Sequence, residues 1–379
     1  MAPVMRNTIE ISGAGPAGLA AALAVVRSGH KACVYERRED VGKRFHGDFQ
    51  GLENWTTEID VLDELASMGI ESSFEHTPFY EVTCFSPDGV PREFRSIQPL
   101  FYLIRRGSEA GCLDTSLKQQ ALDAGVEIRF GEKLHRLPSG GIVTQGPRRA
   151  DAIAAGYLFD TDMADGAYAA ISDQLAPKGY AYLLVSSGRG TLASCLFDDF
   201  HNERRYLERC VEFFTGKVNV RMNNPRRFGG GGNFSIPRTA RKGNILYAGE
   251  SAGFQDPLFG FGIRWALISG VEAGRALAGG DPARYERIWK RRLRAYHQTA
   301  ATNRWFYERL GDRGYATALR KYSQENDART WMKRAYAPSL WKKAWYYAMA
   351  SRHDKPLLQA HENCDCTWCR CERHMAQTG

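Results

Sequence analysis

The residues with the clearest chemical meaning are three glycines near the start of the chain, spaced as Gly-x-Gly-x-x-Gly. An apolar-alternating run at 8–12 precedes them, and a helix-like stretch at 16–28 begins among them. In this order of strand, turn and helix, the first glycine permits the turn, the second admits a pyrophosphate and the third lets helix and strand pack closely. The pattern therefore predicts dinucleotide-binding residues at Gly13, Gly15, Pro16, Ala17 and Gly18.

A second apolar strand at 31–35 ends in an acidic residue, Glu36. A carboxylate in this position can accept a hydrogen bond from a ribose 2′-hydroxyl, whereas a 2′-phosphate would meet like charge. We assign Glu36 and the following Arg37 to the same cofactor site.

A second glycine-rich segment, at 248–257, predicts the other end of this site. A short buried strand at 244–248 leads into Gly249 and Glu250, and a helix-like run begins at 262. Open α/β sheets bind ligands where an acid and a helix N-terminus meet at a strand's carboxyl end. Together the two segments indicate one FAD site, with an ordinary strand-to-helix loop as the alternative for the second segment.

The order of these motifs resembles the geranylgeranyl reductase branch of the para-hydroxybenzoate hydroxylase-like flavoproteins, over about residues 8–290. In that family a strand ends in Gly-Asp, followed by Ala-Ala-Gly-Phe and then Pro-Leu-x-Gly-x-Gly-Ile. Residues 249–263 here read GESAGFQDPLFGFGI. The resemblance implies that Glu250, in place of the usual Asp, bonds the ribityl chain. It also implies an isoalloxazine lined by Pro257, Gly260, Gly262 and Ile263, with a helix N-terminus near flavin N1 and O2.

The family also has an arginine before a helix that carries an aspartate. By this resemblance Arg105 or Arg106 touches the FAD, because both precede a helix-like stretch that contains Asp114. A pair of solvated arginines at a helix start is the alternative.

Two positions are candidates for the catalytic proton chemistry. Some family members carry a cysteine after the second strand, but residues 41–50 have none, which leaves His46 as the acid or base there. Histidine suits this role because its unperturbed pKa is about 6.5. The family's Pro-x-x-Tyr-x-Trp motif is echoed at 177–182, where Tyr182 replaces the usual Trp. For Tyr182, substrate contact and plain packing both remain open.

The implied fold class is α/β, with a Rossmann-type FAD-binding domain, an inserted antiparallel-sheet substrate domain and a helical C-terminal addition. The expected FAD-binding parts are 1–80, 101–150 and 241–283, the substrate parts are 81–100 and 151–240, and a helical region at 284–355 and a Cys-rich tail at 356–379 follow. The four consecutive glycines at 229–232 are expected to form a mobile or tightly turning loop.

The net charge of +8 is concentrated late in the chain, where residues 284–355 hold 18 Lys and Arg against 6 Asp and Glu, interleaved with aromatics. Basic helices with aromatic faces can lie on anionic membrane, which would suit a lipid substrate. They can equally be packed helices with solvated outer faces. We expect no nucleic-acid binding, because no binding module accompanies the charge. No run is long and apolar enough to span a bilayer and no signal peptide is visible, so a cytoplasmic protein is expected.

The tail carries four cysteines within eight residues, and their density predicts a metal site. Zinc is the first expectation and an iron–sulfur cluster the second, with a dithiol relay to the flavin or a disordered tail as the alternatives. The expected ligands are Cys364, Cys366, Cys369 and Cys371, with His361 or His374 able to complete a shell.

These observations predict an FAD-dependent oxidoreductase that transfers hydride from reduced flavin to a carbon–carbon double bond of an apolar, isoprenoid or lipid-like substrate. No separate nicotinamide domain is visible, so electrons would come from transiently bound NAD(P)H, a ferredoxin-like carrier or a quinol. The alternatives are a flavin monooxygenase of an aromatic or lipid substrate and a non-catalytic redox sensor of flavin and metal. The family's hydroxylases place an Ala/Gly-Asp-Gly motif before the second domain, and its absence at 143–151 weakens the monooxygenase comparison.

Overall fold

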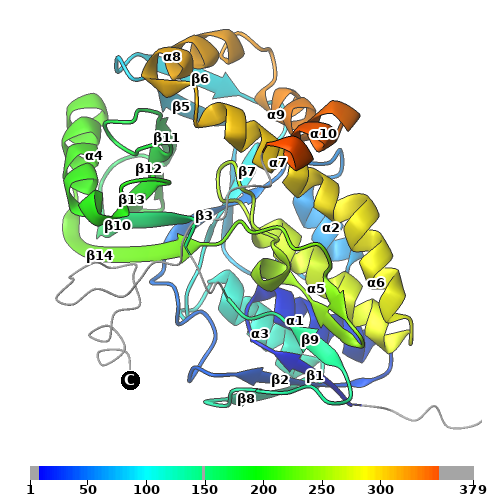
Figure 1. Cartoon of the computed structure of the whole chain (residues 1–379). Helices are drawn as coiled ribbons and strands as arrows, with labels where there is room; N and C mark the ends of the chain where they lie inside the picture. The colour runs from blue at the N-terminus through cyan, green and yellow to red at the C-terminus, as the bar shows by residue number, and fades with distance from the viewer. Residues whose placement is uncertain (1–7, 147–149, 350–379) are drawn as a thin grey trace, which may run out of the picture.

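The computed structural model describes residues 8–146 and 150–349. These residues form a mostly parallel sheet carrying helices, a separate seven-stranded sheet and a group of C-terminal helices (Figure 1). The expected α/β class, with a Rossmann-type unit, a second mostly antiparallel sheet and a helical C-terminal region, is confirmed. No helix among the described residues has the length and apolar character that a membrane crossing needs.

Six strands form the first sheet, in the order β15-β16-β9-β1-β2-β8. They are β1 (Thr8–Ser12), β2 (Lys31–Glu36), β8 (Glu127–Phe130), β9 (Gly141–Val143), β15 (Arg241–Lys242) and β16 (Ile245–Tyr247). Neighbours run parallel except β15 and β16. Parallel strands bring their carboxyl ends to one edge, so the residues that follow β1, β2, β9 and β16 meet there although they are far apart in sequence.

The helices on this sheet are held together by glycines. Helix α1 (Pro16–Arg27) packs against α5 (Ile263–Ala278), and α3 (Leu113–Asp123) packs against α1 as well. A Cβ on Gly270 would lie 2.1 Å from the carbonyl oxygen of Ala17, and one on Gly274 would lie 2.5 Å from that of Ala21. Glycines spaced four apart therefore let α5 touch the backbone of α1, which holds the two glycine-rich segments beside each other.

The second sheet has the order β14-β10-β13-β12-β11-β5-β6. Its strands are β5 (Glu81–Phe85), β6 (Pro91–Arg95), β10 (Ala152–Asp160), β11 (Gly166–Ala170), β12 (Tyr180–Ser186), β13 (Arg189–Leu196) and β14 (Asn223–Gly232). Neighbours are antiparallel except β11 and β5. A 3₁₀ turn (Phe200–Asn202) leads into α4 (Glu203–Val218), which packs against β13 and β10. Both expected substrate segments, 81–100 and 151–240, contribute strands to this sheet.

The glycine run at 229–232 is not a loop, and that expectation is wrong. It forms the end of β14, where Gly229 pairs with Ala155 and Gly232 pairs with Ala152 of β10. Pairing with β10 gives the backbone N–H and C=O groups of these glycines hydrogen-bond partners, which holds the run in an extended conformation.

A three-stranded antiparallel sheet in the order β3-β7-β4 joins the two larger sheets (Figure 1). It consists of β3 (Phe49–Glu53), β4 (His76–Phe79) and β7 (Phe101–Arg105), and α2 (Val61–Ser67) lies between β3 and β4 in sequence. Arg264 at the start of α5 is wholly buried and ion-pairs with Glu53 and Glu64. The N-terminus of α5 is thereby fixed to β3 and α2.

The C-terminal region continues as helices beyond α5. They are α6 (Pro282–Ile288), a π-helical turn (Trp289–Leu293), α7 (Arg294–Tyr307), α8 (Gly311–Tyr322), α9 (Ala328–Tyr336) and α10 (Leu340–Ala348). Buried side chains of α7, α8 and α9 share one hydrophobic cluster with residues of β3, β4, β7 and β11. The helical expectation for 284–355 therefore holds over the residues described, and most of these helices pack on the sheets.

Candidate active site

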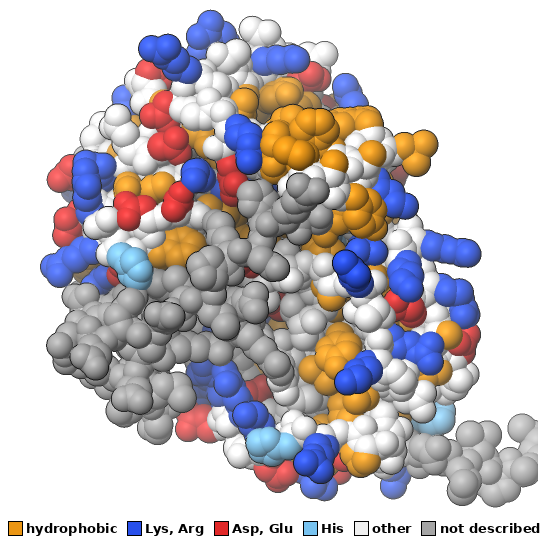
Figure 2. Space-filling model, viewed as in Figure 1, with side chains coloured by type: hydrophobic (Ala, Val, Ile, Leu, Met, Phe, Trp, Pro, Cys, Tyr) orange, Lys and Arg blue, Asp and Glu red, His pale blue; other side chains and the backbone are white. Residues whose placement is uncertain are grey.

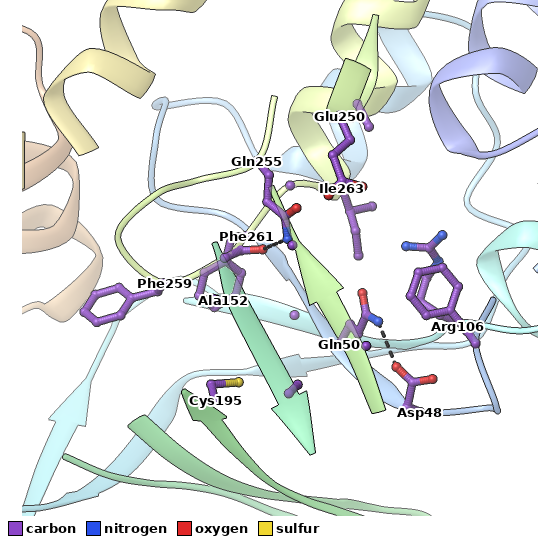
Figure 3. Close-up of a pocket in the computed structure, with 18 of the residues that line it drawn as sticks. Asp48, Gln50, Arg106, Ala152, Cys195, Glu250, Gln255, Phe259, Phe261 and Ile263 are labelled. Atoms are coloured by element: carbon purple, nitrogen blue, oxygen red, sulfur yellow. Dashed lines mark hydrogen bonds between the residues drawn. The ribbon is translucent and has the colours of Figure 1, made fainter. Parts of the chain in front are cut away.

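One cavity of about 2240 Å³ runs from the glycine-rich edge of the first sheet to the helices of the C-terminal region. Pockets for drug-sized ligands measure roughly 300–1,000 Å³, so this space can hold a dinucleotide and a second molecule together. Figure 3 shows its middle, where Glu250 and Ile263 lie above Gln50 and Arg106, and Cys195 and Phe259 lie further along.

The first glycine-rich turn has the geometry that its three glycines predict. Gly13 adopts a φ of +107°, which disfavours any residue with a side chain. A Cβ on Gly18 would lie 1.9 Å from the carbonyl oxygen of Gly13, so this contact between α1 and the turn after β1 requires glycine. A Cβ on Gly15 would meet nothing within 4 Å, and this residue lines the cavity at the uncapped N-terminus of α1. Pro16 and Ala17 line the cavity beside it.

Glu36 ends β2 at the same edge and lines the cavity. One of its carboxylate oxygens accepts a hydrogen bond from the N–H of Ala14 at 3.0 Å, and the other accepts one from the N–H of Arg38 at 3.0 Å. The acid is therefore held against the turn by backbone donors. Arg37 is exposed and lines the cavity next to it.

Glu250 is held by a residue that the sequence did not identify, Arg44. Its carboxylate accepts hydrogen bonds from Nη1 of Arg44 at 3.0 Å and from the N–H of Asn233 at 3.0 Å, and Arg44 also donates to the carbonyl oxygen of Gly231. The arginine thus ties the loop after β2 to β16 and β14 across the cavity. A separation of 206 residues left no sequence signal for this pair. Gly249, with a φ of +62°, lines the cavity beside Glu250.

The loop before α5 is organised by a buried acid, Asp256. Its carboxylate accepts from the N–H groups of Leu258 and Phe259 at 3.0 and 2.9 Å, and from the hydroxyl of Tyr336 on α9 at 2.8 Å. Burial raises the pKa of Asp256 to about 6, against these hydrogen bonds, which lower it. This role of Asp256 was not predicted, although an acid that accepts from the N–H groups two and three residues ahead is a common turn pattern.

Three of the four positions expected around the isoalloxazine line the cavity, namely Gly260, Gly262 and Ile263. Pro257 is buried and is not among the lining residues, so its expected contact with the isoalloxazine stays a prediction. Gly262 caps α5 without a side-chain hydrogen bond, and the positive end of that helix therefore faces the cavity.

The two arginines at the end of β7 have different surroundings. Arg106 lines the cavity, donates from Nε and Nη2 to Asp114 at 2.8 Å each, and stacks its guanidinium 4.1 Å from the ring centre of Phe45. Arg105 instead donates to Glu75, Glu109 and the carbonyl oxygen of Ala110, and it is not among the lining residues. Both arginines are buried, so the alternative of a solvated pair is wrong. Of the two, only Arg106 can meet a ligand in the cavity.

The two catalytic candidates lie in different walls of the cavity. The backbone N–H of His46 donates to Asp48 at 3.0 Å, and the same carboxylate accepts from Nε2 of Gln50 at 2.8 Å (Figure 3). Tyr182 lies on β12, where burial and then the nearby Cys195 and Asp48 raise the pKa of its phenol well above the usual value. Its hydroxyl therefore keeps its proton at neutral pH. Asp48 and Gln50 are buried or half-buried lining residues that sequence reasoning missed.

The far end of the cavity is an apolar chamber built from β5, β6, β11, α7, α8 and α9. We call this end the aromatic chamber, and its residues are Val82, Phe94, Tyr168, Tyr307, Tyr315, Leu319, Tyr322, Trp331, Met332 and Tyr336. These elements come from segments separated by most of the chain, and single aromatic residues in amphipathic helices are indistinguishable from ordinary core. The chamber was therefore not predicted.

Among residues 8–146 and 150–349, no group of three or more His, Cys, Asp and Glu side chains could hold a metal ion. The four expected cysteine ligands at 364–371 lie outside the described residues. The metal site in the tail stays a prediction.

The comparisons with known proteins agree on the fold. A family model described as an NAD(P)-binding Rossmann-like domain matches residues 11–50. No curated protein matches the chain in sequence.

Several solved structures are similar over nearly the whole chain. A geranylgeranyl bacteriochlorophyll reductase-like protein from Thermoplasma acidophilum has a TM-score of 0.70 at 17% identity, covering 91% of this chain and 96% of its own. A triple mutant of the flavin-dependent brominase Bmp2 has a TM-score of 0.62 at 14% identity, covering 90% and 97%. A flavoprotein/dehydrogenase from Cytophaga hutchinsonii has a TM-score of 0.59 at 15% identity, covering 91% and 96%. The resemblance that the motifs predict is confirmed at the level of the fold, which this chain shares with a reductase-like protein, with flavin-dependent halogenases and with a p-nitrophenol 4-monooxygenase.

Proposed function

We propose that the protein is an FAD-dependent oxidoreductase that reduces a carbon–carbon double bond of an apolar, isoprenoid or lipid-like substrate. The observation that carries this proposal is the single cavity that joins a dinucleotide-type turn to the aromatic chamber. The turn suits a pyrophosphate and the chamber suits an apolar molecule, and the two meet at the N-terminus of α5.

The residues present fit FAD. Gly15 leaves open space at the uncapped N-terminus of α1, where pyrophosphate oxygens would find backbone N–H donors. Glu36 would take the ribose hydroxyls, Glu250 with Arg44 the ribityl region, and the start of α5 the pyrimidine side of the flavin. When bound, the flavin supplies the hydride chemistry.

The protein's chemical part is to orient the substrate, exclude water and deliver a proton. Tyr182 is the stronger donor candidate, because its phenol stays protonated and faces the cavity from the wall shared with Cys195. His46 is the second, held by its backbone bond to Asp48. For the electron supply we propose transiently bound NAD(P)H, with a ferredoxin-like carrier as the other source.

The first test is the visible spectrum of the purified full-length chain, before and after reconstitution with FAD. An oxidised-flavin spectrum that bleaches on anaerobic NADPH titration and reoxidises slowly in air supports a reductase. Rapid oxygen consumption coupled to a hydroxylated product would overturn the reductase assignment. Failure to bind FAD even on reconstitution would overturn the whole proposal.

The proton donor is tested by Tyr182→Phe, with Tyr157→Phe on β10 as the control because Tyr157 does not line the cavity. Loss of a general acid lowers kcat by roughly 10²-fold or more, with bound FAD unchanged. An unchanged kcat for Tyr182→Phe would exclude this residue and direct the same experiment to His46→Gln.

A further inference from the structure

An apolar patch covers the end of α7 and the outer side of α10. Its side chains are exposed to an extent unusual for their size, with Leu340 at 87%, Trp341 at 57%, Leu310 at 43% and Phe306 at 41%. Figure 2 shows hydrophobic side chains gathered where Figure 1 draws α10, with Lys and Arg around them. We call these four residues the α7–α10 patch.

Ring contacts make the patch a preformed surface. Phe306 stacks on Trp345 with ring centres 5.3 Å apart, and it meets Trp341 edge-on at 6.4 Å. Thr302 on α7 also donates to the carbonyl oxygen of Lys342 at 2.9 Å, which fixes α10 against α7. A set of large apolar side chains held in one place and left in contact with water marks an interaction site more often than an accident of packing.

The patch is continuous with the cavity. Phe306 and Leu310 belong to both, because each is exposed on the outside and also lines the cavity, as does Asn303 one turn earlier on α7. An apolar molecule could therefore pass from the patch into the aromatic chamber without leaving an apolar environment.

The charge on these helices has one sign. Helices α7 and α10 carry two arginines and two lysines and no acidic residue in their sequences. The acid that follows α7, Glu308, is paired at 2.9 Å with Arg304, which is itself buried, so this pair adds no net charge to the patch. Lys343 is exposed on α10, two residues beyond Trp341. Basic side chains next to exposed Trp, Leu and Phe are the composition that binds the surface of anionic lipid bilayers.

We propose that the α7–α10 patch docks on an anionic lipid surface and that the apolar substrate enters the cavity from the bilayer between Phe306 and Leu310. The entry route rests on the proposed function, whereas the docking does not. Insertion of the patch to the depth of the lipid headgroups would bury Leu340 and Trp341, and Lys343 would remain among the phosphates.

The test is co-sedimentation of the full-length protein with vesicles of phosphatidylcholine alone and of phosphatidylcholine mixed with phosphatidylglycerol. The protein is expected to bind the mixed vesicles and to be released by salt. The double variant Leu340→Ser/Trp341→Ser should weaken this binding by roughly 10-fold or more, because it removes the two most exposed apolar side chains of the patch from the surface that the lipid would bury.

The chain offers a matched control in Ile97→Ser/Ile59→Ser, which removes two equally exposed apolar side chains, at 85% and 59%, from elsewhere. The control should bind as the parent protein does. No binding of the parent to mixed vesicles, or an equal loss in both double variants, would overturn the proposal. A parent dimer that the Leu340→Ser/Trp341→Ser variant dissociates, together with no vesicle binding, would assign the patch to a second copy of the chain and also overturn it.

Bound FAD and turnover of a detergent-dispersed apolar substrate are measured on the same samples. Leu340 and Trp341 do not line the cavity, so both properties should be unchanged in the patch variant. Absence of flavin or of turnover in the parent would sink the proposed function, while the vesicle result would still decide the docking.

Discussion

The two ends of the cavity are built in opposite ways. At the glycine-rich end the turn presents backbone to the cavity, and the critical residues are those that lack a side chain, such as Gly13, Gly15 and Gly18. At the other end the aromatic chamber is made of large side chains brought together by three sheet strands and three helices. A surface made of backbone depends on short-range spacing, whereas one made of side chains depends on the whole fold.

The largest effect of a single substitution is expected at the glycine-rich turn. Gly18→Ala places a Cβ 1.9 Å from a carbonyl oxygen, so we expect loss of flavin and a destabilisation of about 3 kcal/mol, the upper end for overpacking. Gly15→Ala places a Cβ in open space at a φ of −77°, so its FAD-free protein should melt as the parent does while binding FAD more weakly. Thermal melting and bound flavin distinguish the two. Equal stability of both variants would contradict the packing role of Gly18.

The loop between the two ends should respond to pH through Asp256. Its pKa in the folded protein is raised from the ordinary 3.8 to about 6, so the folded state holds this proton more tightly than the unfolded state. The stability contributed by the proton is fully present below 3.8 and is lost as the pH rises through about 6, by about 3 kcal/mol in all.

The measurement is the free energy of unfolding in urea for the parent and for Asp256→Asn, from pH 4 to pH 8. The free energy of unfolding of the parent should fall relative to that of the variant up to about pH 6. Above that pH the difference between the two should stay constant. Exposed Asp162→Asn is the control. A difference between parent and Asp256→Asn that does not change with pH would show that Asp256 titrates normally.

At the aromatic chamber the expected effects are on substrate rather than flavin. Trp331 is half-buried, lines the cavity and packs its ring 4.4 Å from that of Tyr322. Trp331→Ala should raise KM for an apolar substrate by roughly 10-fold with bound FAD unchanged. Steady-state kinetics with flavin quantified in the same sample checks this, and loss of flavin in step with KM would mean that the two ends are not independent.

A smaller effect is expected from the limited access of water and reagents to two cysteines that line the cavity. Cys84 and Cys195 line the cavity, and burial raises the pKa of each thiol to about 12. Both should therefore stay protonated and alkylate slowly with iodoacetamide at neutral pH, and rapidly once the protein is unfolded. Peptide mapping by mass spectrometry gives the rates. Alkylation as fast as that of a free cysteine would mean that water and reagent enter freely.

The glycine-rich end of the cavity could be predicted from the sequence, whereas the aromatic chamber could not. The fold class and the meeting of the two glycine-rich segments were predictable, because turns need glycine at set positions and parallel strands share one edge. The different surroundings of Arg105 and Arg106 were not predictable, because Arg105 is the last residue of β7, Arg106 follows the strand, and nothing local indicates which of the two side chains meets the cavity. The pairing of Arg44 with Glu250 and the chamber depend on contacts between distant segments.

The glycine run at the end of β14 is the remaining instructive case. Strands at such a position normally carry branched side chains, and here composition suggested a loop, yet pairing with β10 overrode the low strand propensity of glycine. The composition of residues 229–232 does not indicate that β10 is available to pair with them.

The glycine run of β14 also affects the width of the cavity. Gly230 lines the cavity, and a Cβ there would meet nothing within 4 Å. A Cβ added at this position would narrow the cavity without meeting the surrounding residues, and larger side chains would narrow it further. The size of molecule that reaches the flavin could therefore be graded by a series from Ala to Val to Leu at Gly230, which makes substrate selectivity adjustable independently of the machinery on either side.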